Sequence, residues 1–332
     1  MKKLYKAAVI GCGRIGALPV SLKKSNRPKT HAEAYQLNSK IQLAGLVDTD
    51  KNKLKLVKKF YPGVPIFTDP IEMLEKIKPD IVSITTAPKS HSKLICLAAK
   101  SGCRLIFCEK PISLSINEAE EAVKYCQKRG SKLLINHHRH FDPLVNKWKK
   151  KIDDGLIGPI YQGTAYYHNG FFNYMTHMLD LMRMVLGEAD SVCGWYNKIT
   201  SSEDSDVNID GWIKFKKGTL VSIHSLTKDY GFFDLDLLGE KGRVTFKAFG
   251  STKIEYQKKI KNKFYSGYYD LSEPKKEGKL RSPIQISINR AVSVLDGKSK
   301  QISTGQDAMV ILKILLAFKK SADLGNKEIK LK

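Results

Sequence analysis

In the first 135 residues short apolar runs alternate with amphipathic segments, as in a parallel β-sheet with helices on both faces. The predicted strands are Lys6–Ile10, Gln42–Val47, Asp80–Thr85, Arg104–Cys108 and Lys132–Ile135. The predicted helices are His31–Asn38, Pro70–Ile77, His91–Lys100 and Ile116–Arg129. Ser115 and Glu118 have the spacing of a capping box, which predicts that the last helix begins at Ile116. The pattern therefore predicts an α/β fold with a doubly wound parallel sheet over residues 1–135.

After a predicted helix at Leu144–Asp153 the pattern becomes rich in β-strands. These strands are Tyr161–His168, Ser191–Asn197, Gly211–Phe215, Thr219–Leu226, Phe233–Leu238 and Arg243–Phe249. Tight connections at Lys216–Gly218 and Gly239–Gly242 predict hairpins, and hence a large, mostly antiparallel open sheet. Further helices are predicted at Tyr174–Leu186, Ile284–Leu295 and Gly305–Asp323. We expect a second, α+β domain over residues 136–332, with a C-terminal helix able to pack back on the first domain.

The length and charge of the chain narrow the classes of protein to consider. A chain of 332 residues is long enough for two domains. It carries 57 Lys and Arg against 33 Asp and Glu, a net charge of +24. Only nine of these cations are arginines, the residues that favour forked contacts to phosphates and base edges. We therefore interpret the charge mainly as a solvated lysine surface and expect no nucleic-acid partner.

The cysteines and the hydropathy pattern bear on the environment of the protein. The six cysteines form no C-x-x-C pair, and most lie in apolar runs where a reduced thiol packs as a small hydrophobe. No window approaches the roughly 18 apolar residues of a membrane span, and the N-terminal apolar stretch is too short for a signal peptide. We expect a cytoplasmic protein with no membrane partner, and we predict no metal site.

The first predicted strand ends in a glycine-rich motif. In Gly11-Cys-Gly13-Arg14-Ile15-Gly16 the missing side chains allow a sharp turn and a close approach to a pyrophosphate. The second strand ends in Asp48, whose carboxylate can accept both hydroxyls of a ribose. A glycine turn without a ligand is the alternative. Because an acidic Asp48 repels a 2′-phosphate, the motif predicts NAD rather than NADP as the cofactor.

The spacing between the motif and Asp48 is larger than usual. Gly16 and Asp48 are 32 residues apart, against roughly 20 in a plain dinucleotide-binding unit. The extra residues 17–29 contain four cations, namely Lys23, Lys24, Arg27 and Lys29. They predict a lid over the cofactor cleft, with Arg27 in contact with an anionic substrate or the pyrophosphate. A solvated surface loop is the alternative.

Several further motifs resemble one enzyme family over nearly the whole chain. The motifs are Asp80–Pro88 with His91, Cys108-Glu109-Lys110-Pro111, Asn136–Pro143, Gly155–Gly158, His177-Met-Leu-Asp180 and Thr304–Asp307. In this order they resemble the Gfo/Idh/MocA family of nicotinamide-dependent sugar oxidoreductases.

The resemblance implies a Rossmann domain followed by a domain for substrate binding and oligomerisation. It implies that the loops after the third and fourth predicted strands flank the nicotinamide, that Lys110 faces the substrate and that the Lys110–Pro111 bond is cis. It also implies a homodimer or homotetramer, formed through the open face of the second sheet. The cofactor contacts expected in the two loops are Thr85, Thr86, Pro88, His91, Glu109 and Lys110.

The chemistry of the predicted catalytic residues agrees with this resemblance. Lys110 follows a strand at the edge of an α/β sheet where ligands collect, so its ammonium can donate to a substrate oxygen. His177 and Asp180 share one helix face, and an imidazole with a near-neutral pKa suits proton exchange with an alcohol. A structural salt bridge for the lysine and a packing role for the histidine are the alternatives.

The predicted substrate contacts surround His177. Asn173 stands one helical turn before it, where family dehydrogenases usually carry Asp, and an amide can still bind a sugar hydroxyl. Tyr167 and His168, at the end of a strand, are expected to stack against or hydrogen-bond a sugar ring, with a packed strand end as the alternative.

Taken together, these patterns predict an NAD(H)-dependent oxidoreductase. It transfers hydride between nicotinamide and a ring hydroxyl or keto carbon of a sugar, and the lid cations favour a phosphorylated or nucleotide-linked one. One alternative is an elimination or glycosidic cleavage that recycles bound NAD internally. The other is a catalytically silent NAD-binding regulatory protein.

Overall fold

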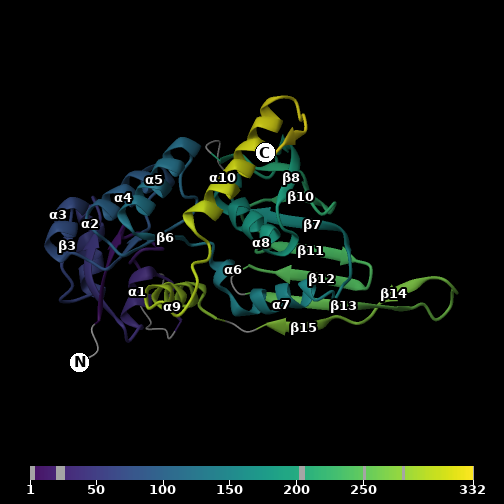
Figure 1. Cartoon of the computed structure of the whole chain (residues 1–332), viewed down its shortest axis with the longest axis horizontal. Coiled ribbons are helices and arrows are strands. Elements are labelled where there is room, and N and C mark those ends of the chain that lie inside the picture. The colour runs from purple at the N-terminus through teal and green to yellow at the C-terminus, as the bar shows by residue number, and fades with distance from the viewer. Residues whose placement is uncertain (1–3, 20–26, 202–205, 250–251, 279–280, 332) are drawn as a thin grey trace. The chain divides into compact units, whose positions relative to one another are not determined.

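A computed structural model describes residues 4–19, 27–201, 206–249, 252–278 and 281–331 (Figure 1). The chain divides into two compact units. The first comprises Met1–Phe141 and Ser282–Leu312, and the second comprises Asp142–Arg281 and Lys313–Lys332. Residues 282–312 thus belong with the N-terminal part of the chain, whereas the sequence analysis placed a single boundary after residue 135.

Among the described residues, the sheet of the first unit has six parallel strands. They are β1 (Tyr5–Ile10), β2 (Ile41–Val47), β3 (Ile66–Phe67), β4 (Ile81–Ile84), β5 (Leu105–Cys108) and β6 (Lys132–Ile135). The strand order is β3-β2-β1-β4-β5-β6, so the chain builds the sheet from β1 toward one edge and then from β4 toward the other. In such sheets ligands bind beyond the carboxyl ends of the strands where the two halves meet, here between β1 and β4. The predicted Rossmann fold is confirmed.

Helices connect these strands and cover both faces of the sheet. They are α1 (His31–Gln36), α2 (Lys51–Phe60), α3 (Pro70–Ile77), α4 (His91–Lys100) and α5 (Ile116–Arg129), followed after β6 by the short α6 (His138–Phe141). Helices α4 and α5 pack side by side (Figure 1). Every residue of β4 and β5 is buried, because a strand covered on both faces needs apolar residues at almost every position.

A helix from the C-terminal part of the chain completes the core of the first unit. This helix, α9 (Pro283–Leu295), packs against α1 and α6, and its apolar residues join the same core cluster as Tyr35 and Phe107. Burying each large apolar side chain stabilises the fold by about 1.5–3 kcal/mol. Lys132 of β6 donates to the carbonyl of Val294 at 2.9 Å. This packing explains why residues 282–312 fold with the first unit.

Two backbone hydrogen bonds join the residues on either side of the inserted segment. The amide of His31 donates to the carbonyl of Ile15, and the amide of Ala32 to that of Gly16, both at 2.9 Å. The ends of the inserted segment are therefore held together. Residues 20–26, which include Lys23 and Lys24 of the predicted lid, lie outside the described residues.

The second unit is built on a large sheet, of ten strands within the described residues. They are β7 (Ile160–His168), β8 (Ala189–Tyr196), β9 (Ile209–Phe215), β10 (Leu220–Leu226), β11 (Asp234–Gly239), β12 (Gly242–Lys247), β13 (Lys253–Lys261), β14 (Tyr269–Leu271), β15 (Lys275–Gly278) and β16 (Ile329–Lys330). The order is β14-β13-β12-β11-β7-β10-β9-β8-β16, and β15 pairs with β13. Only the β7–β10 pair is parallel among these described strands, which confirms the mostly antiparallel sheet.

Two helical segments of the second unit matter for the site. Helix α7 (Pro143–Asp153) precedes the sheet, and α8 (Thr176–Leu186) follows β7 after a π-helical turn, Phe171–Met175. Nearly all of α8 is buried, including its polar residues His177 and Asp180. The helix α10 (Gly305–Asp323) begins in the residues of the first unit and ends in those of the second.

Several local predictions are confirmed and one is wrong. The two hairpin connections join antiparallel pairs, β9 with β10 and β11 with β12. Helix α5 begins at Ile116 as predicted, but Ser115 makes no side-chain cap. The carboxylate of Glu118 instead accepts from the hydroxyls of Ser92 (3.1 Å) and Ser113 (2.8 Å), which compete successfully for it.

Candidate active site

The three glycines of the motif after β1 meet three different spatial demands. Gly11 has φ +98°, and a Cβ there would lie 2.8 Å from the carbonyl carbon of Thr85. A Cβ on Gly16 would lie 1.8 Å from the carbonyl oxygen of Gly11. A Cβ on Gly13 would meet nothing within 4 Å. The loop is therefore closed at both ends and open in the middle, which fits a bound pyrophosphate.

Hydrogen bonds to the neighbouring strands fix this loop. The amide of Gly11 donates to the carbonyl of Val47 at 2.8 Å, and the hydroxyl of Thr85 donates to the carbonyl of Gly11 at 2.6 Å. Arg14 and Ile15 are exposed at the turn. Burial and, to a smaller extent, the nearby charge of Asp48 raise the pKa of the Cys12 thiol to about 12. Cys12 is thus a packing residue of the loop and not a nucleophile.

Asp48, at the end of β2, is oriented by backbone amides. One carboxylate oxygen accepts from the amide of Cys12 at 2.8 Å and the other from the amide of Asp50 at 2.9 Å. A carboxylate oxygen can accept two hydrogen bonds, so both oxygens can still bind hydroxyl groups. The ammonium of Lys53 lies 3.9 Å from this carboxylate, a cation that the sequence analysis did not associate with Asp48.

The loops after β4 and β5 are joined by a buried histidine. His91 is completely buried, with Nδ1 2.7 Å from the carbonyl oxygen of Pro111 and Nε2 3.0 Å from that of Thr86. The pKa of His91 is lowered from its usual value, because the effect of burial outweighs the hydrogen bonds to the two carbonyl oxygens, which raise it. His91 was predicted to bind the cofactor, but both of its ring nitrogens face protein carbonyls, so it holds the two loops together instead.

The predicted catalytic lysine follows β5 directly. Lys110 is half-buried, and the Lys110–Pro111 bond is cis. The preceding residue, Glu109, accepts hydrogen bonds from His31 at 2.9 Å and from Asn136 at 2.7 Å. In the other loop the hydroxyl of Thr86 is 2.7 Å from that of Ser90, and Pro88 opens a short 3₁₀ turn. Lys110, Thr86 and the glycine loop thus all follow carboxyl ends of strands in one parallel sheet.

In the second unit, the predicted proton-transfer residue lies near one end of a buried helix. His177 is 6% and Asp180 1% exposed, and their spacing puts them on one face of α8. Asn173 lies in the preceding π-helical turn, where its side-chain amide donates to the carbonyl of Asn169 at 3.1 Å. The structure thus brings Asn173, His177 and Asp180 into consecutive turns, as the spacing predicted.

Aromatic rings surround the start of this helix. The ring of His168 lies 4.5 Å from that of Tyr174 and 5.2 Å from that of Phe249, and the ring of Tyr174 lies 6.4 Å from that of His177. His168 is 3% exposed, and Phe249, at 49%, presents much of its ring to solvent. Planar groups in this arrangement can face one side of a sugar ring.

Tyr167 does not belong to this group of aromatic rings. It is completely buried, and its hydroxyl both donates to the carbonyl of Ile209 at 3.0 Å and accepts from the amide of the same residue at 2.8 Å. Side chains alternate between the two faces of a strand, so Tyr167 points into the core while His168 points to the opposite face. Its predicted contact with substrate is therefore not supported.

Two family models match the chain. One describes an oxidoreductase family with an NAD-binding Rossmann fold and matches residues 5–137; the other describes the GFO/IDH/MocA C-terminal domain and matches residues 168–245. The chain belongs to the Gfo/Idh/MocA family of oxidoreductases.

Curated relatives include two inositol dehydrogenases. Myo-inositol 2-dehydrogenase of Thermotoga maritima is 27% identical over 261 residues, covering 72% of this chain and 74% of that protein. The scyllo-inositol 2-dehydrogenase (NAD(+)) of Bacillus subtilis is 29% identical over 270 residues, covering 74% of each chain. For D-apiose dehydrogenase of Paraburkholderia graminis the chain spans about half of the relative's length, 54%, at 23% identity over 60% of this chain.

Solved structures show the same Gfo/Idh/MocA fold over nearly the whole chain. The WlbA dehydrogenase of Bordetella pertussis, solved with NADH and UDP-GlcNAcA, has a TM-score of 0.78 at 20% identity and covers 99% of both chains. An oxidoreductase of Desulfitobacterium hafniense described as NADPH-dependent has a TM-score of 0.82 at 17% identity, covering 99% of this chain and 98% of its own.

The sequence analysis missed three features of this Gfo/Idh/MocA member. His31 and Asn136 hold Glu109, and Asp206 accepts from the amides of Phe172 (2.8 Å) and Asn173 (3.1 Å). A Cβ on Gly170, which precedes the π-helical turn, would lie only 2.3 Å from a carboxylate oxygen of Asp206. The sequence analysis predicted that His31 opens a helix, and the capping box of Thr30 and Glu33 is present there, but neither feature indicates that His31 contacts Glu109. No local signal connects Asp206 to the turn, because 33 residues separate it from Asn173.

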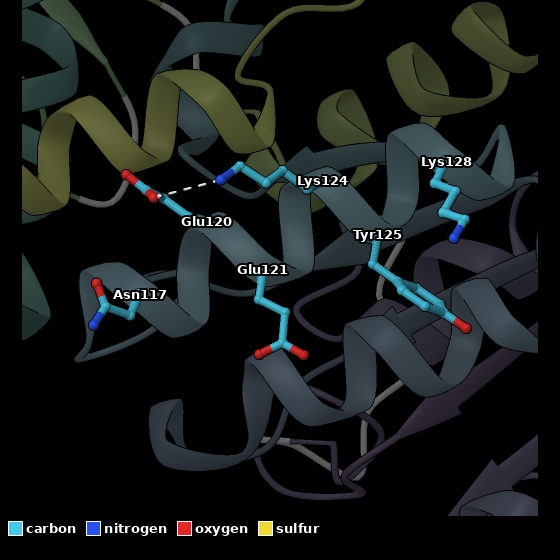
Figure 2. A pocket seen from close by; sticks show the side chains of 6 residues that line it. All are labelled: Asn117, Glu120, Glu121, Lys124, Tyr125 and Lys128. Atoms are coloured by element: carbon cyan, nitrogen blue, oxygen red, sulfur yellow. Dashed lines mark ion pairs between the residues drawn. The ribbon is translucent and has the colours of Figure 1, made fainter.

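A shallow hollow along α5 is lined by side chains from that helix alone, and Figure 2 shows Glu120 and Lys124 paired there at 3.9 Å. The other lining residues are Asn117, Glu121, Tyr125 and Lys128. Within the described ranges, no three His, Cys, Asp or Glu side chains are arranged to hold a metal ion, and no helix has the length and apolarity to span a membrane.

Proposed function

We propose that this chain is an NAD(H)-dependent dehydrogenase acting on one ring carbon of a sugar. The observation that carries the proposal lies within the first unit. A glycine loop that fits a dinucleotide follows β1, and Lys110 follows β5 of the same parallel sheet. Ligands of such sheets collect at this edge, so Lys110 is well placed to act beside the cofactor.

Each catalytic side chain has a distinct part in this proposal. Bound NAD⁺ supplies the nicotinamide ring that takes the hydride from the substrate carbon. Lys110 donates to a substrate oxygen and polarises it, and His177 takes the proton of a substrate hydroxyl group. Asp180 orients the imidazole, and Asn173 binds a hydroxyl in place of a carboxylate.

The cofactor in this proposal is NAD rather than NADP. Asp48 presents a carboxylate, 10% exposed, held toward the glycine loop by the amide of Cys12. A 2′-phosphate would be repelled by this charge, and Lys53, 3.9 Å away, is partly neutralised by it. Calorimetry with both cofactors tests the assignment: we expect NAD⁺ to bind at least about tenfold tighter, and Asp48→Ser to narrow the gap. Tighter binding of NADP⁺ to the wild-type protein would overturn it.

The substrate in this proposal is a phosphorylated or nucleotide-linked sugar. The net charge of +24 and the exposed cations Arg27 and Lys29, near the end of the inserted segment, support an anionic substrate. The WlbA relative was solved with a UDP-sugar, whereas other relatives are named for neutral inositols. A panel of sugars, inositols, sugar phosphates and UDP-sugars, followed by the absorbance of reduced nicotinamide, decides between them. Turnover confined to neutral compounds would refute the anionic preference.

We also propose that the enzyme is a cytoplasmic homodimer or homotetramer. Large apolar side chains on the second unit's sheet are exposed, among them Tyr161 (57%), Trp195 (40%) and Leu220 (39%), and such surfaces commonly pack against a partner. The six cysteines are all free of disulfides, which agrees with a reducing compartment. Light scattering after size exclusion gives the subunit number, and a monomer at micromolar concentration would contradict the proposal.

A further inference from the structure

A chain of buried polar side chains ends at the residue before Lys110. Tyr35, Ser83 and His31 are all 0% exposed. The hydroxyl of Tyr35 lies 2.5 Å from that of Ser83, which lies 2.7 Å from Nδ1 of His31. Nε2 of His31 lies 2.9 Å from a carboxylate oxygen of Glu109. Burying four polar groups costs free energy unless each is hydrogen-bonded, so their arrangement calls for an explanation.

One distribution of protons satisfies every member of this chain. Glu109 as a carboxylate can only accept, so Nε2 of His31 must carry a proton. If Nδ1 is then unprotonated, the hydroxyl of Ser83 donates to it, and the hydroxyl of Tyr35 donates to Ser83. If Nδ1 were protonated as well, the Ser83 hydroxyl would accept from it and donate to the Tyr35 hydroxyl, and the phenol proton of Tyr35 would then have no acceptor in this chain. The geometry therefore favours a neutral imidazole with its proton on Nε2.

The carboxylate of Glu109 is held from a second side as well. The side-chain amide of Asn136 donates to the same oxygen at 2.7 Å. Burial raises the pKa of Glu109, but the hydrogen bond from His31, the charge of Lys110 and the hydrogen bond from Asn136 together lower it below its usual value. Glu109 is therefore ionised at neutral pH, and two donors fix its direction.

These contacts flank Lys110 on both sides. Glu109 precedes it and is fixed by His31, while Pro111 follows it and its carbonyl oxygen lies 2.7 Å from Nδ1 of His91. Fixing the residues on either side restricts the backbone from which the lysine side chain extends. A catalytic group that is misplaced by even about 1 Å can lose about 100-fold in rate.

We propose that His31 is a positioning residue for Lys110, acting through Glu109, with Ser83 and Tyr35 setting its tautomer. The inference rests on the proposed function, because it assigns Lys110 a part in catalysis. His31 opens α1 two residues after the inserted segment ends at Lys29.

The test compares two substitutions of His31. His31→Gln keeps an N–H donor near the position of Nε2, and His31→Leu removes both the Nε2 donor and the Nδ1 acceptor. We expect the Leu variant to lose about 10-fold to 100-fold in kcat, with KM for NAD⁺ changed less than about threefold because the phosphate loop is untouched. The Gln variant should recover most of this loss. In the Leu variant the acidic limb of the pH–rate profile should move to higher pH, because Glu109 loses the donor that lowers its pKa.

A second measurement does not depend on turnover. Hydrogen–deuterium exchange of the peptide containing residues 109–111 should be faster in His31→Leu and in Ser83→Ala than in the wild-type protein. Ser131→Ala is the matched control, because its buried hydroxyl donates to the carbonyl of Cys103 at 2.7 Å, away from Glu109. Its exchange at 109–111 should be unchanged.

The outcomes separate this inference from the proposed function. Equal kcat in the Leu and Gln variants, or faster exchange at 109–111 in Ser131→Ala, would overturn the positioning role. If the wild-type protein oxidised no compound of the panel, the proposed function would fail, and the exchange data would still decide whether His31 fixes the Glu109 segment. Should His31→Leu fail to fold, Ser83→Ala carries the exchange test alone, and unchanged exchange there would refute the role.

Discussion

At the scale of single residues, two glycines of the loop have different roles, Gly16 in folding and Gly13 in cofactor binding. A methyl group on Gly13 would enter open space, whereas one on Gly16 would collide with the carbonyl of Gly11. We predict that Gly13→Ala keeps the wild-type melting temperature but weakens NAD⁺ binding at least about tenfold, since the methyl group occupies the room of the pyrophosphate. Gly16→Ala should lower the melting temperature. Thermal unfolding and calorimetry check both; undiminished NAD⁺ affinity in Gly13→Ala would place the pyrophosphate elsewhere.

A second residue makes stability depend on pH. Burial raises the pKa of Asp234 to about 6, although the charge of Lys247 lowers it. The folded state therefore binds this proton more tightly than the unfolded state does, and the contribution of Asp234 to stability falls as pH rises from about 4 to about 6. Above pH 6 the loss is complete.

Replacing this carboxyl group tests the effect. We predict that Asp234→Asn stabilises the protein by about 1–2 kcal/mol at pH 8 and changes little at pH 4. Asp236→Asn is the contrasting control, because Asp236 accepts from the guanidinium of Arg243 at 2.7 and 2.8 Å and its loss should destabilise. Urea unfolding at both pH values gives the comparison. Stabilisation by Asp234→Asn that was equal at pH 4 and pH 8 would show that the carboxyl group does not titrate as described.

Residue patterns predicted only part of the site. The place of Asp48 directly after β2 was predictable because an apolar run marks the strand that ends at Val47. The His31–Glu109 contact was not, because 78 residues lie between its partners and nothing local marks the pair. Tyr167 and His168 were predicted together as substrate contacts, yet adjacent strand residues face opposite sides and only one of them can line a site.

At the scale of elements, helix caps show where a local pattern is sufficient. Thr30 and Glu33 form a complete capping box at α1, whereas Ser115 makes no cap at α5. We predict that Thr30→Ala destabilises the protein by about 1 kcal/mol and that Ser115→Ala changes stability by less than about 0.5 kcal/mol. Chemical unfolding of the two variants measures this. Equal losses would mean that Ser115 caps its helix after all.

The elements themselves were predicted unevenly. Strands β5 and β6 and helix α10 agree with their predicted ranges to within one residue, because their apolar runs are continuous or strongly periodic. Helix α2 was missed because only Leu54 and Val57 of its ten residues are buried. Strand β13 was missed because most of its residues are polar and much of it is exposed, so no alternating pattern marks it.

At the scale of the whole molecule, the chain passes between its two units three times, after Phe141, Arg281 and Leu312. Residues up to 141 fold in the first unit, and residues 282–312 return to it through α9. The sequence shows an amphipathic helix there but not which core it completes. The family resemblance gave the order of the domains, while the packing of α9 gave the division that the structure has.

The account depends most on the catalytic roles of Lys110 and of His177 in an NAD-dependent oxidation. The direct measurement is the rate of nicotinamide reduction over the substrate panel for the wild-type protein, Lys110→Ala and His177→Asn, with NAD⁺ affinity measured for each. The account predicts turnover of at least one sugar, a loss of about 100-fold or more in kcat for each variant, and NAD⁺ affinity within about threefold of wild type. Full turnover by either variant would contradict it.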